Sequence, residues 1–382
     1  MTRPMLLPGL TPLWRGPRTL QLGLDPRRAV VLDLPNPAAA GVLDLLDGVR
    51  TEAAVLAAAA RRGIGEHDAR TLLDALRRHR LVAGAHTFLP RTLGGPARRR
   101  LAAEAAALAL GRLTRAPAPA TVRPPDSALQ PDSAPPPDTA ADVLRRRLRA
   151  RVRVTGRGRL GLPIAIALAA AGIGHLEPAL SGQVEPGEFV PAATADEAPK
   201  PGDRAVLAAR TIAALAPGTR VHPLGRPDDA TFVVQVGPPV GPVALYALAH
   251  RRVPHLAVGL RDGTAVIGPL VVPGGRPCLN CLELHRADRD PAWPALAAQL
   301  GTPDAGGPWT RGTATEACAA ATALIAAGYA VATVLRHVDG DPPQPPGSTL
   351  EIANPTAVRR RTWDPHPACD CTRRRRSATR RK

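Results

Sequence analysis

The sequence contains few aromatic side chains and almost no lysine. Phenylalanine, tyrosine and tryptophan make up 2% of the 382 residues, and lysine occurs only at Lys200 and Lys382. Proteins that bind single-stranded nucleic acid stack bases on aromatic rings, so this scarcity argues against that class. No apolar run reaches the roughly 18 residues of a membrane span, and prolines interrupt the N-terminal apolar stretch where a signal peptide would lie. We therefore expect a cytoplasmic protein that does not act at a membrane.

The sequence is instead rich in arginine. Lysine and arginine together number 50 against 32 acidic residues, which gives a formal charge of +18. Enrichment in alanine, arginine, proline and glycine is typical of a GC-rich genome, so codon usage and solubility account for much of this charge. The alternative is attraction of an acidic partner, protein or nucleic acid, by the arginine-rich segments 145–159 and 359–382.

The length and the composition predict two domains joined by a linker. Residues 1–113 are expected to form a small mixed domain, and residues 142–372 a larger one. Residues 114–141, rich in proline and alanine, have almost nothing to bury and are expected to be a semi-extended linker. Residues 373–382 are expected to be a disordered basic tail.

In the first domain, two or three short strands precede three short helices. The expected strands are Thr19–Gly23 and Ala29–Leu34, with a third short one at Pro12–Arg15. Apolar residues then recur at three- and four-residue steps, which predicts helices over Pro37–Leu46, from a Thr51 N-cap to Arg62, and over Glu66–His79, with a further basic helix over Ala97–Leu113. This order predicts a winged-helix-like α+β domain.

The second domain alternates strands with helices. The expected strands are Arg151–Thr155, Thr231–Val236, His255–Gly259, Ala265–Val272 and Leu350–Ile352, and the expected helices are Ile164–Ala171 and Cys318–Leu335. Such alternation predicts an α/β domain with a mostly parallel, Rossmann-like sheet.

A glycine-rich loop follows the first of these strands. Gly156, Gly158 and Gly161 form a G-x-G-x-x-G pattern between strand and helix, where backbone N–H groups could approach a phosphate. A working nucleotide site also needs a carboxylate after the next strand, to hold the ribose hydroxyl groups. That strand ends without an acid and contains Pro178, and the later strand ends at Gly237, again without an acid to hold magnesium. The sequence thus predicts a vestigial nucleotide site and argues against ATP as a cofactor.

Four cysteines have the spacing of a structural zinc site. Cys278 and Cys281 form a C-x-x-C pair, and Cys369 and Cys371 form a C-x-C pair about 90 residues later. Four thiolates satisfy tetrahedral zinc and leave no open catalytic position. Disulfides, or substitution by His285 or His366, are the alternatives. The fifth cysteine, Cys318, lies in an apolar, alanine-rich segment and is expected to be structural rather than nucleophilic.

Together these motifs resemble a known superfamily. The stretches Val154–Gly161, Ala171–Gly174 and Pro277–Cys281 are similar to the ThiF/MoeB/HesA proteins, relatives of ubiquitin-activating enzymes. The run Pro277–Pro294 is similar to the ThiF-like, cyclodehydratase-domain proteins of bacteriocin biosynthesis, also called TOMM leader-peptide-binding proteins. This resemblance implies a ThiF-type sheet domain that works beside a YcaO-type cyclodehydratase, which carries out the ATP-using step.

The N-terminal domain resembles a PqqD-like peptide-recognition element. In that family a leader peptide adds a strand to the sheet edge and packs on the third helix, which here correspond to Ala29–Leu34 and Glu66–Arg80. The resemblance implies peptide-binding residues Val30, Leu32 and Arg77. The alternatives are a plain capping domain or a winged-helix DNA binder that uses Arg77, Arg78 and Arg80.

Active members of the superfamily adenylate a carboxylate with ATP and magnesium, using paired aspartates and basic phosphate clamps. The aspartate positions correspond here to Leu180, Gly182 and Gly237, and Lys200 or Arg204 stands where a clamp would lie. We therefore expect no catalytic residues, and a scaffold that binds a precursor leader peptide and presents it to a YcaO-type cyclodehydratase. An ATP-dependent adenylyltransferase and a nucleic-acid-binding regulator are the alternatives. The sequence leaves open whether the chain forms a homodimer.

Overall fold

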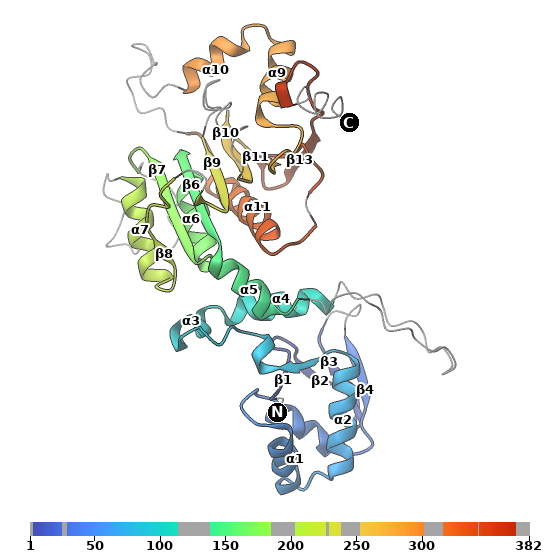
Figure 1. Cartoon of the computed structure of the whole chain (residues 1–382). Helices are drawn as coiled ribbons and strands as arrows, with labels where there is room; N and C mark the ends of the chain where they lie inside the picture. The colour runs from blue at the N-terminus through green and yellow to red at the C-terminus, as the bar shows by residue number, and fades with distance from the viewer. Residues whose placement is uncertain are drawn as a thin grey trace, which may run out of the picture. The chain divides into compact units, whose positions relative to one another are not determined.

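The computed structural model describes residues 3–24, 29–113, 138–184, 203–226, 229–237, 253–301, 316–342 and 344–371. The chain divides into two compact units, residues 1–145 and residues 146–382 (Figure 1). The expected linker lies outside the described residues over positions 114–137, as do Lys200 and the basic tail from residue 372 onward.

The first unit contains two small antiparallel sheets and several short helices. The two-stranded sheet pairs β1 (Pro4–Leu6) with β5 (Val82–Gly84), and the three-stranded sheet has the order β2 (Pro12–Trp14), β3 (Thr19–Leu22), β4 (Val30–Asp33). The helices are η1 (Pro37–Leu45), α1 (Glu52–Arg61), α2 (Glu66–Arg78), η2 (Ala85–Thr87), α3 (Gly95–Arg100) and α4 (Ala102–Leu113), and α5 (Ala140–Arg149) crosses the boundary between the units.

Alternation along β3 and β4 builds the core of this unit. Leu20, Leu22 and Leu32 face inward and pack on apolar residues of η1, α1 and α2. Thr51 caps α1 as predicted, since its hydroxyl accepts the N–H of Ala54 at 3.3 Å. The helix expected over Pro37–Leu46 is a 3₁₀ helix, and the helix expected over 97–113 is two helices that meet at the fully buried Leu101.

The second unit is built on an eight-stranded sheet. Its order is β13-β12-β11-β10-β9-β6-β7-β8, and the strands from β10 to β8 are parallel, whereas those from β10 to β13 are antiparallel. The strands are β6 (Arg151–Arg157), β7 (His175–Ser181), β8 (Arg220–Val221), β9 (Phe232–Val236), β10 (His255–Arg261), β11 (Thr264–Val271), β12 (Ser348–Asn354) and β13 (Ala357–Thr362). The helices are α6 (Gly161–Ala170), α7 (Arg204–Leu215), α9 (Leu279–Arg289), α10 (Trp293–Gly301) and α11 (Ala320–Val338). This architecture confirms the predicted α/β class.

Pro178 lies inside β7 without disrupting the sheet. The strand β8 pairs only with His175 and Leu176, and the carbonyl of Leu176 accepts the N–H of His222 at 3.2 Å. Backbone groups two residues apart face the same side of a strand, so position 178 also faces the β8 side, beyond the end of that short strand. The missing donor of Pro178 therefore costs no ladder hydrogen bond.

The helix α11 packs against the sheet. Its residues Ala326, Ala330 and Val334 are buried in the main core, and the helix contacts α6, β10, β11 and β12. Contrary to the expectation from sequence, α11 is long and apolar enough to cross a membrane by length and composition. Its apolar face is covered by the sheet, which accounts for that composition in a core helix.

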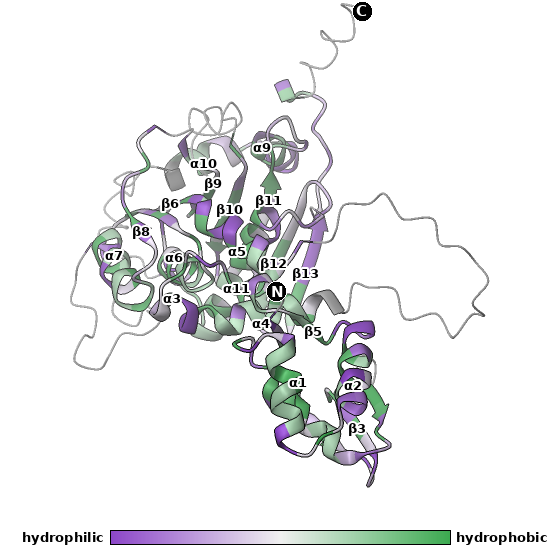
Figure 2. Cartoon of the chain, turned by 60° about the horizontal axis from the view of Figure 1, so that its bottom comes forward, coloured by the Kyte–Doolittle hydropathy of each residue, from purple (hydrophilic) through white to green (hydrophobic). Residues whose placement is uncertain are grey.

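The antiparallel half of the sheet ends in an arginine-rich edge strand that the sequence did not predict. The strand β13 carries Arg359, Arg360 and Arg361 and is largely exposed. Figure 2 shows it as a mostly hydrophilic strand at the end of the sheet. Pairing with β12 thus makes the first part of the arginine-rich segment 359–382 a strand of the sheet.

Candidate functional site

A groove lies beside β4 in the first unit. It has a volume of about 110 Å³ and is lined by residues of β4, the turn after it, and α2. Apolar side chains at its base include Leu32, Leu72 and Ala75, whereas Asp33 and Asp68 add carboxylates. The strand and the helix expected to bind a peptide therefore lie together along one groove.

The strand β4 is the edge of its sheet, and the register identifies its free backbone side. The N–H of Leu34 donates to the carbonyl of Arg18 at 2.7 Å, so the backbone groups of Leu32 and Val30 face β3 as well. The alternate residues, Val31 and Asp33, then present their backbone groups to the open edge. Val30 and Leu32, the residues predicted from the sequence, have side chains that pack on the core and backbone groups that face β3.

Arg77 does not line the groove. Its guanidinium lies 2.6 Å from the carboxylate of Glu52 on α1 and 3.5 Å from that of Asp74. The hydrogen bond with Glu52 raises the pKa of Arg77 and lowers that of Glu52. The structure thus brings β4 and α2 together as expected, but directs this arginine to α1.

The glycine loop of the second unit joins β6 to α6. Gly156 and Gly158 have φ angles of +107° and +124°, values that favour glycine. A Cβ at Gly156 would lie 1.9 Å from the carbonyl oxygen of Val236, so only glycine fits there. The three predicted glycines therefore form a close strand–loop–helix turn at the carboxyl end of β6.

No carboxylate follows β7 among the described residues next to this loop. Leu180 is 4% exposed and packs against Gly161, where an added Cβ would lie 2.5 Å from its Cδ2. The hydroxyl of Ser181 donates to the carbonyl of Gly156 at 3.3 Å, and Arg204 donates to the carbonyl of Ser181 at 3.2 Å. Leu180 thus places an apolar side chain where the sequence comparison expected a carboxylate, and the guanidinium of Arg204 binds the backbone at the end of β7.

Glu316, which no sequence motif indicated, contacts the glycine loop. The carboxylate of Glu316 accepts the backbone N–H of Arg159 at 2.6 Å, and a Cβ at Gly158 would lie 2.8 Å from its Oε1. The Arg159 guanidinium in turn donates to the carbonyls of Glu316 and Cys318, at 3.1 and 3.3 Å. Glu316 lies 157 residues beyond Arg159, so no local pattern could have indicated the contact.

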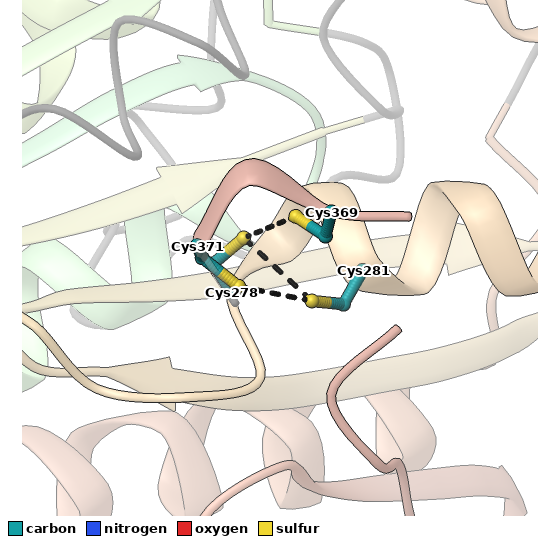
Figure 3. Close-up of side chains that lie close together, drawn as sticks. All are labelled: Cys278, Cys281, Cys369 and Cys371. Atoms are coloured by element: carbon teal, nitrogen blue, oxygen red, sulfur yellow. Dashed lines mark hydrogen bonds between the residues drawn. The ribbon is translucent and has the colours of Figure 1, made fainter. Parts of the chain in front are cut away.

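The four predicted cysteines form one cluster (Figure 3). Their sulfur atoms are 3.9 Å apart for Cys278 and Cys281, 3.6 Å for Cys278 and Cys369, and 3.3 Å for Cys281 and Cys371. Four sulfurs around tetrahedral zinc, with bonds of about 2.3 Å, would be about 3.8 Å apart. All four thiols are free of disulfides, so the cluster can hold a metal ion.

Burial and mutual hydrogen bonds shift the pKa values of the clustered cysteines. A hydrogen bond to Cys281 and burial raise the pKa of Cys278, and burial raises the pKa of Cys371 to about 12. The hydrogen bond from Cys278 lowers the pKa of Cys281 to about 4. Neighbouring thiolates repel one another, so a divalent cation would be needed for all four to ionise.

Helix α9 and the chain after β13 position the cysteines. Cys278 is the N-cap of α9, and Cys281 lies in its first turn, close to the positive end of the helix dipole. Beside the cluster, the Nε2 of His366 lies 2.8 Å from a carboxylate oxygen of Asp288, and the Nε2 of His285 lies 2.9 Å from the carbonyl oxygen of Asp364. Both histidines are thus engaged outside the sulfur cluster, while Cys318 lies apart from it before α11.

Comparisons with protein-family models and with curated proteins found no match. Solved structures resemble the chain over nearly its full length. A crystal structure of E. coli MccB with succinimide is 15% identical, with a TM-score of 0.56, and covers 97% of this chain and 99% of that one. The microcin C7 biosynthetic enzyme MccB in complex with N-formylated MccA is 14% identical, with a TM-score of 0.54 and coverage of 96% and 99%. PaaA is 15% identical, with a TM-score of 0.57 and coverage of 93% and 98%. At this identity the likeness establishes the fold, and it confirms the predicted α/β architecture with a Rossmann-like sheet.

Proposed function

We propose that the protein binds an extended leader segment of a precursor peptide and takes part in the biosynthesis of a modified peptide. The observation that supports this most strongly is the groove between the free edge of β4 and helix α2. An edge strand offers a row of backbone donors and acceptors, and an adjacent apolar groove selects side chains. A peptide can therefore gain affinity from its backbone and specificity from the groove.

The lining of the groove indicates which peptide fits. Leu32, Leu72 and Ala75 provide an apolar base, so we expect the leader to insert an apolar side chain there. Asp33 and Asp68 lie beside that base, and the carboxylate of Asp68 accepts the side-chain N–H of Asn36 at 2.8 Å. Two carboxylates favour a leader segment that also carries a lysine or an arginine.

The fold is compatible with this role. The solved structure of MccB with the peptide MccA is an example of a chain with this architecture bound to a peptide. We further propose that the partner is a YcaO-type cyclodehydratase, that the protein acts in the cytoplasm, and that the four cysteines hold a structural zinc ion. The roles of Gly156, Gly158, Gly161 and Arg204 are then structural, as a vestige of a nucleotide site.

Replacement of Val31 by proline tests strand addition directly. Val31 is 45% exposed, and its N–H faces the open edge, so proline removes a donor to the peptide without breaking the bond to β3. The matched control is Val31→Ala, which keeps the backbone donor. The probe is a fluorescently labelled synthetic peptide taken from a short Cys-, Ser- and Thr-rich reading frame that a search of the neighbouring genes identifies.

Fluorescence anisotropy should show at least about tenfold weaker binding for Val31→Pro than for Val31→Ala, because one or more backbone hydrogen bonds are lost. Leu32→Pro is less informative, since it breaks the β3 ladder and disturbs the domain itself. Equal affinity of the two Val31 variants would refute strand addition. Brisk ATP–pyrophosphate exchange by the isolated protein would instead support adenylation and overturn the scaffold role.

A further inference from the structure

The glycine loop has the backbone of an anion site. Gly156 and Gly158 adopt φ angles that turn the chain sharply between β6 and α6. The start of a ten-residue helix follows directly, and the positive end of its dipole attracts negative charge. A phosphate of a nucleotide is the ligand such a loop ordinarily receives.

In this chain the loop already holds an anion, the carboxylate of Glu316. Its Oε2 accepts the N–H of Arg159 at 2.6 Å, the short distance of a charge-assisted hydrogen bond. Both carboxylate oxygens lie within 3 Å of the point where a Cβ at Gly158 would be, so the carboxylate contacts the loop backbone itself. A phosphate could not approach the same N–H without displacing Glu316.

The position of Glu316 is fixed by a second set of contacts. The Arg159 guanidinium donates to the backbone carbonyls of Glu316 and Cys318. Arg159 thus contacts this segment in two ways. Its backbone N–H binds the side chain of Glu316, and its guanidinium binds the backbone of Glu316 and Cys318. Two residues after Cys318 the chain enters α11, whose alanine-rich face is buried in the core.

We propose that Glu316 is a built-in occupant of the glycine-loop anion site, and that its carboxylate keeps pyrophosphate and nucleotide phosphates out. The inference goes beyond peptide binding and does not depend on it. It gives a physical reason, separate from the absence of a carboxylate at the end of β7, why this chain would not use ATP.

The test is isothermal titration calorimetry of the full chain with inorganic pyrophosphate, a probe that needs no ribose contact. The variants are Glu316→Ala, which empties the loop, and Glu316→Gln, which removes only the charge. The control is Glu351→Ala, because Glu351 lies on β12, 3.7 Å from Arg361, and its loss changes the net charge by the same amount. The control therefore measures how much a general increase in positive charge strengthens anion binding.

We expect Glu316→Ala to bind pyrophosphate at least about tenfold more tightly than the wild type and the control, with Glu316→Gln in between. Thermal melting reports whether the variants fold, and if Glu316→Ala does not, Glu316→Gln carries the test. Wild-type affinity equal to that of the Glu316 variants would overturn the proposal, as would a failure of every folded variant to bind. Leader-peptide binding should be unchanged in both Glu316 variants. A negative result with pyrophosphate would therefore leave the proposed peptide-binding role untouched.

Discussion

At the scale of single residues, two carboxylates of the second unit are engaged with the chain itself. Glu177 bonds Arg153 across the parallel strands at 2.6 Å and also accepts the N–H of Leu224 at 3.0 Å. Glu316 closes the glycine loop in a similar way. Both acidic groups thus contribute to the structure of the second unit.

The buried ion pair between Arg147 and Asp339 should be a major contributor to stability. The two side chains are 4% and 8% exposed and form two hydrogen bonds, of 2.8 and 2.7 Å. Asp339→Ala leaves the guanidinium buried without its counter-charge, so we expect a loss of about 3–5 kcal/mol in the free energy of unfolding. Urea unfolding of the variant and the wild type measures this loss. The control Glu66→Ala removes an exposed pair with Arg70 and should cost less than about 1 kcal/mol; equal losses would contradict the expectation.

At the scale of elements, one ion pair joins α1 to α2. The hydrogen bond from Arg77 holds the pKa of Glu52 below its usual value of 4.5. A lowered pKa means that the stabilisation is present above pH 4.5 and is lost as the pH falls through the folded value. Since both side chains are about one-third exposed, the contribution should be less than about 1 kcal/mol.

The variant Glu52→Gln should therefore melt slightly below the wild type at pH 7, and the difference should vanish near pH 3. Circular dichroism melts at the two pH values measure this. A difference that grows on acidification would show that the pair is not the cause. Peptide affinity at neutral pH should stay unchanged, because neither residue lines the groove.

The four-cysteine cluster brings the start of α9 together with the chain that follows β13. We expect about one zinc ion per chain by elemental analysis, and loss of that ion in Cys369→Ser. Cys318→Ser is the matched control, since its sulfur lies outside the cluster, and it should retain the metal. Metal retained by Cys369→Ser, or lost from Cys318→Ser, would contradict a four-cysteine site.

At the scale of the whole molecule, the two units have separate cores. The first core gathers residues of β3, β4, η1, α1 and α2, and the second gathers those of the large sheet with α6 and α11. Leu144 belongs to the first unit, where it is buried beside Leu7 and Phe88. A fragment that ends at Arg145 should therefore fold and bind the leader peptide within about threefold of the full chain.

Fluorescence anisotropy with the same labelled peptide measures the affinity of this fragment. The complementary fragment from Arg146 should carry the metal and show no peptide binding. Peptide binding by the second fragment, or none by the first although it is folded, would place the peptide site elsewhere.

The sequence by itself determined most of the secondary structure, the α/β class and the four-cysteine set. Those features depend on local rules, namely residue alternation in strands, helical periodicity with caps such as Thr51, and the short spacing of paired cysteines. Among the expected helices and strands, the errors fall mostly at their ends, and at the 3₁₀ helix η1 and the break at Leu101, where packing decides the geometry.

Only the tertiary structure decided which groups meet across long stretches of chain. It directed Arg77 to Glu52 rather than to the groove, made Val31 and Asp33 the residues that face the free edge, and placed Glu316 in the glycine loop. Pairing register and contacts between distant segments depend on how whole elements pack, and no local pattern in the sequence encodes them.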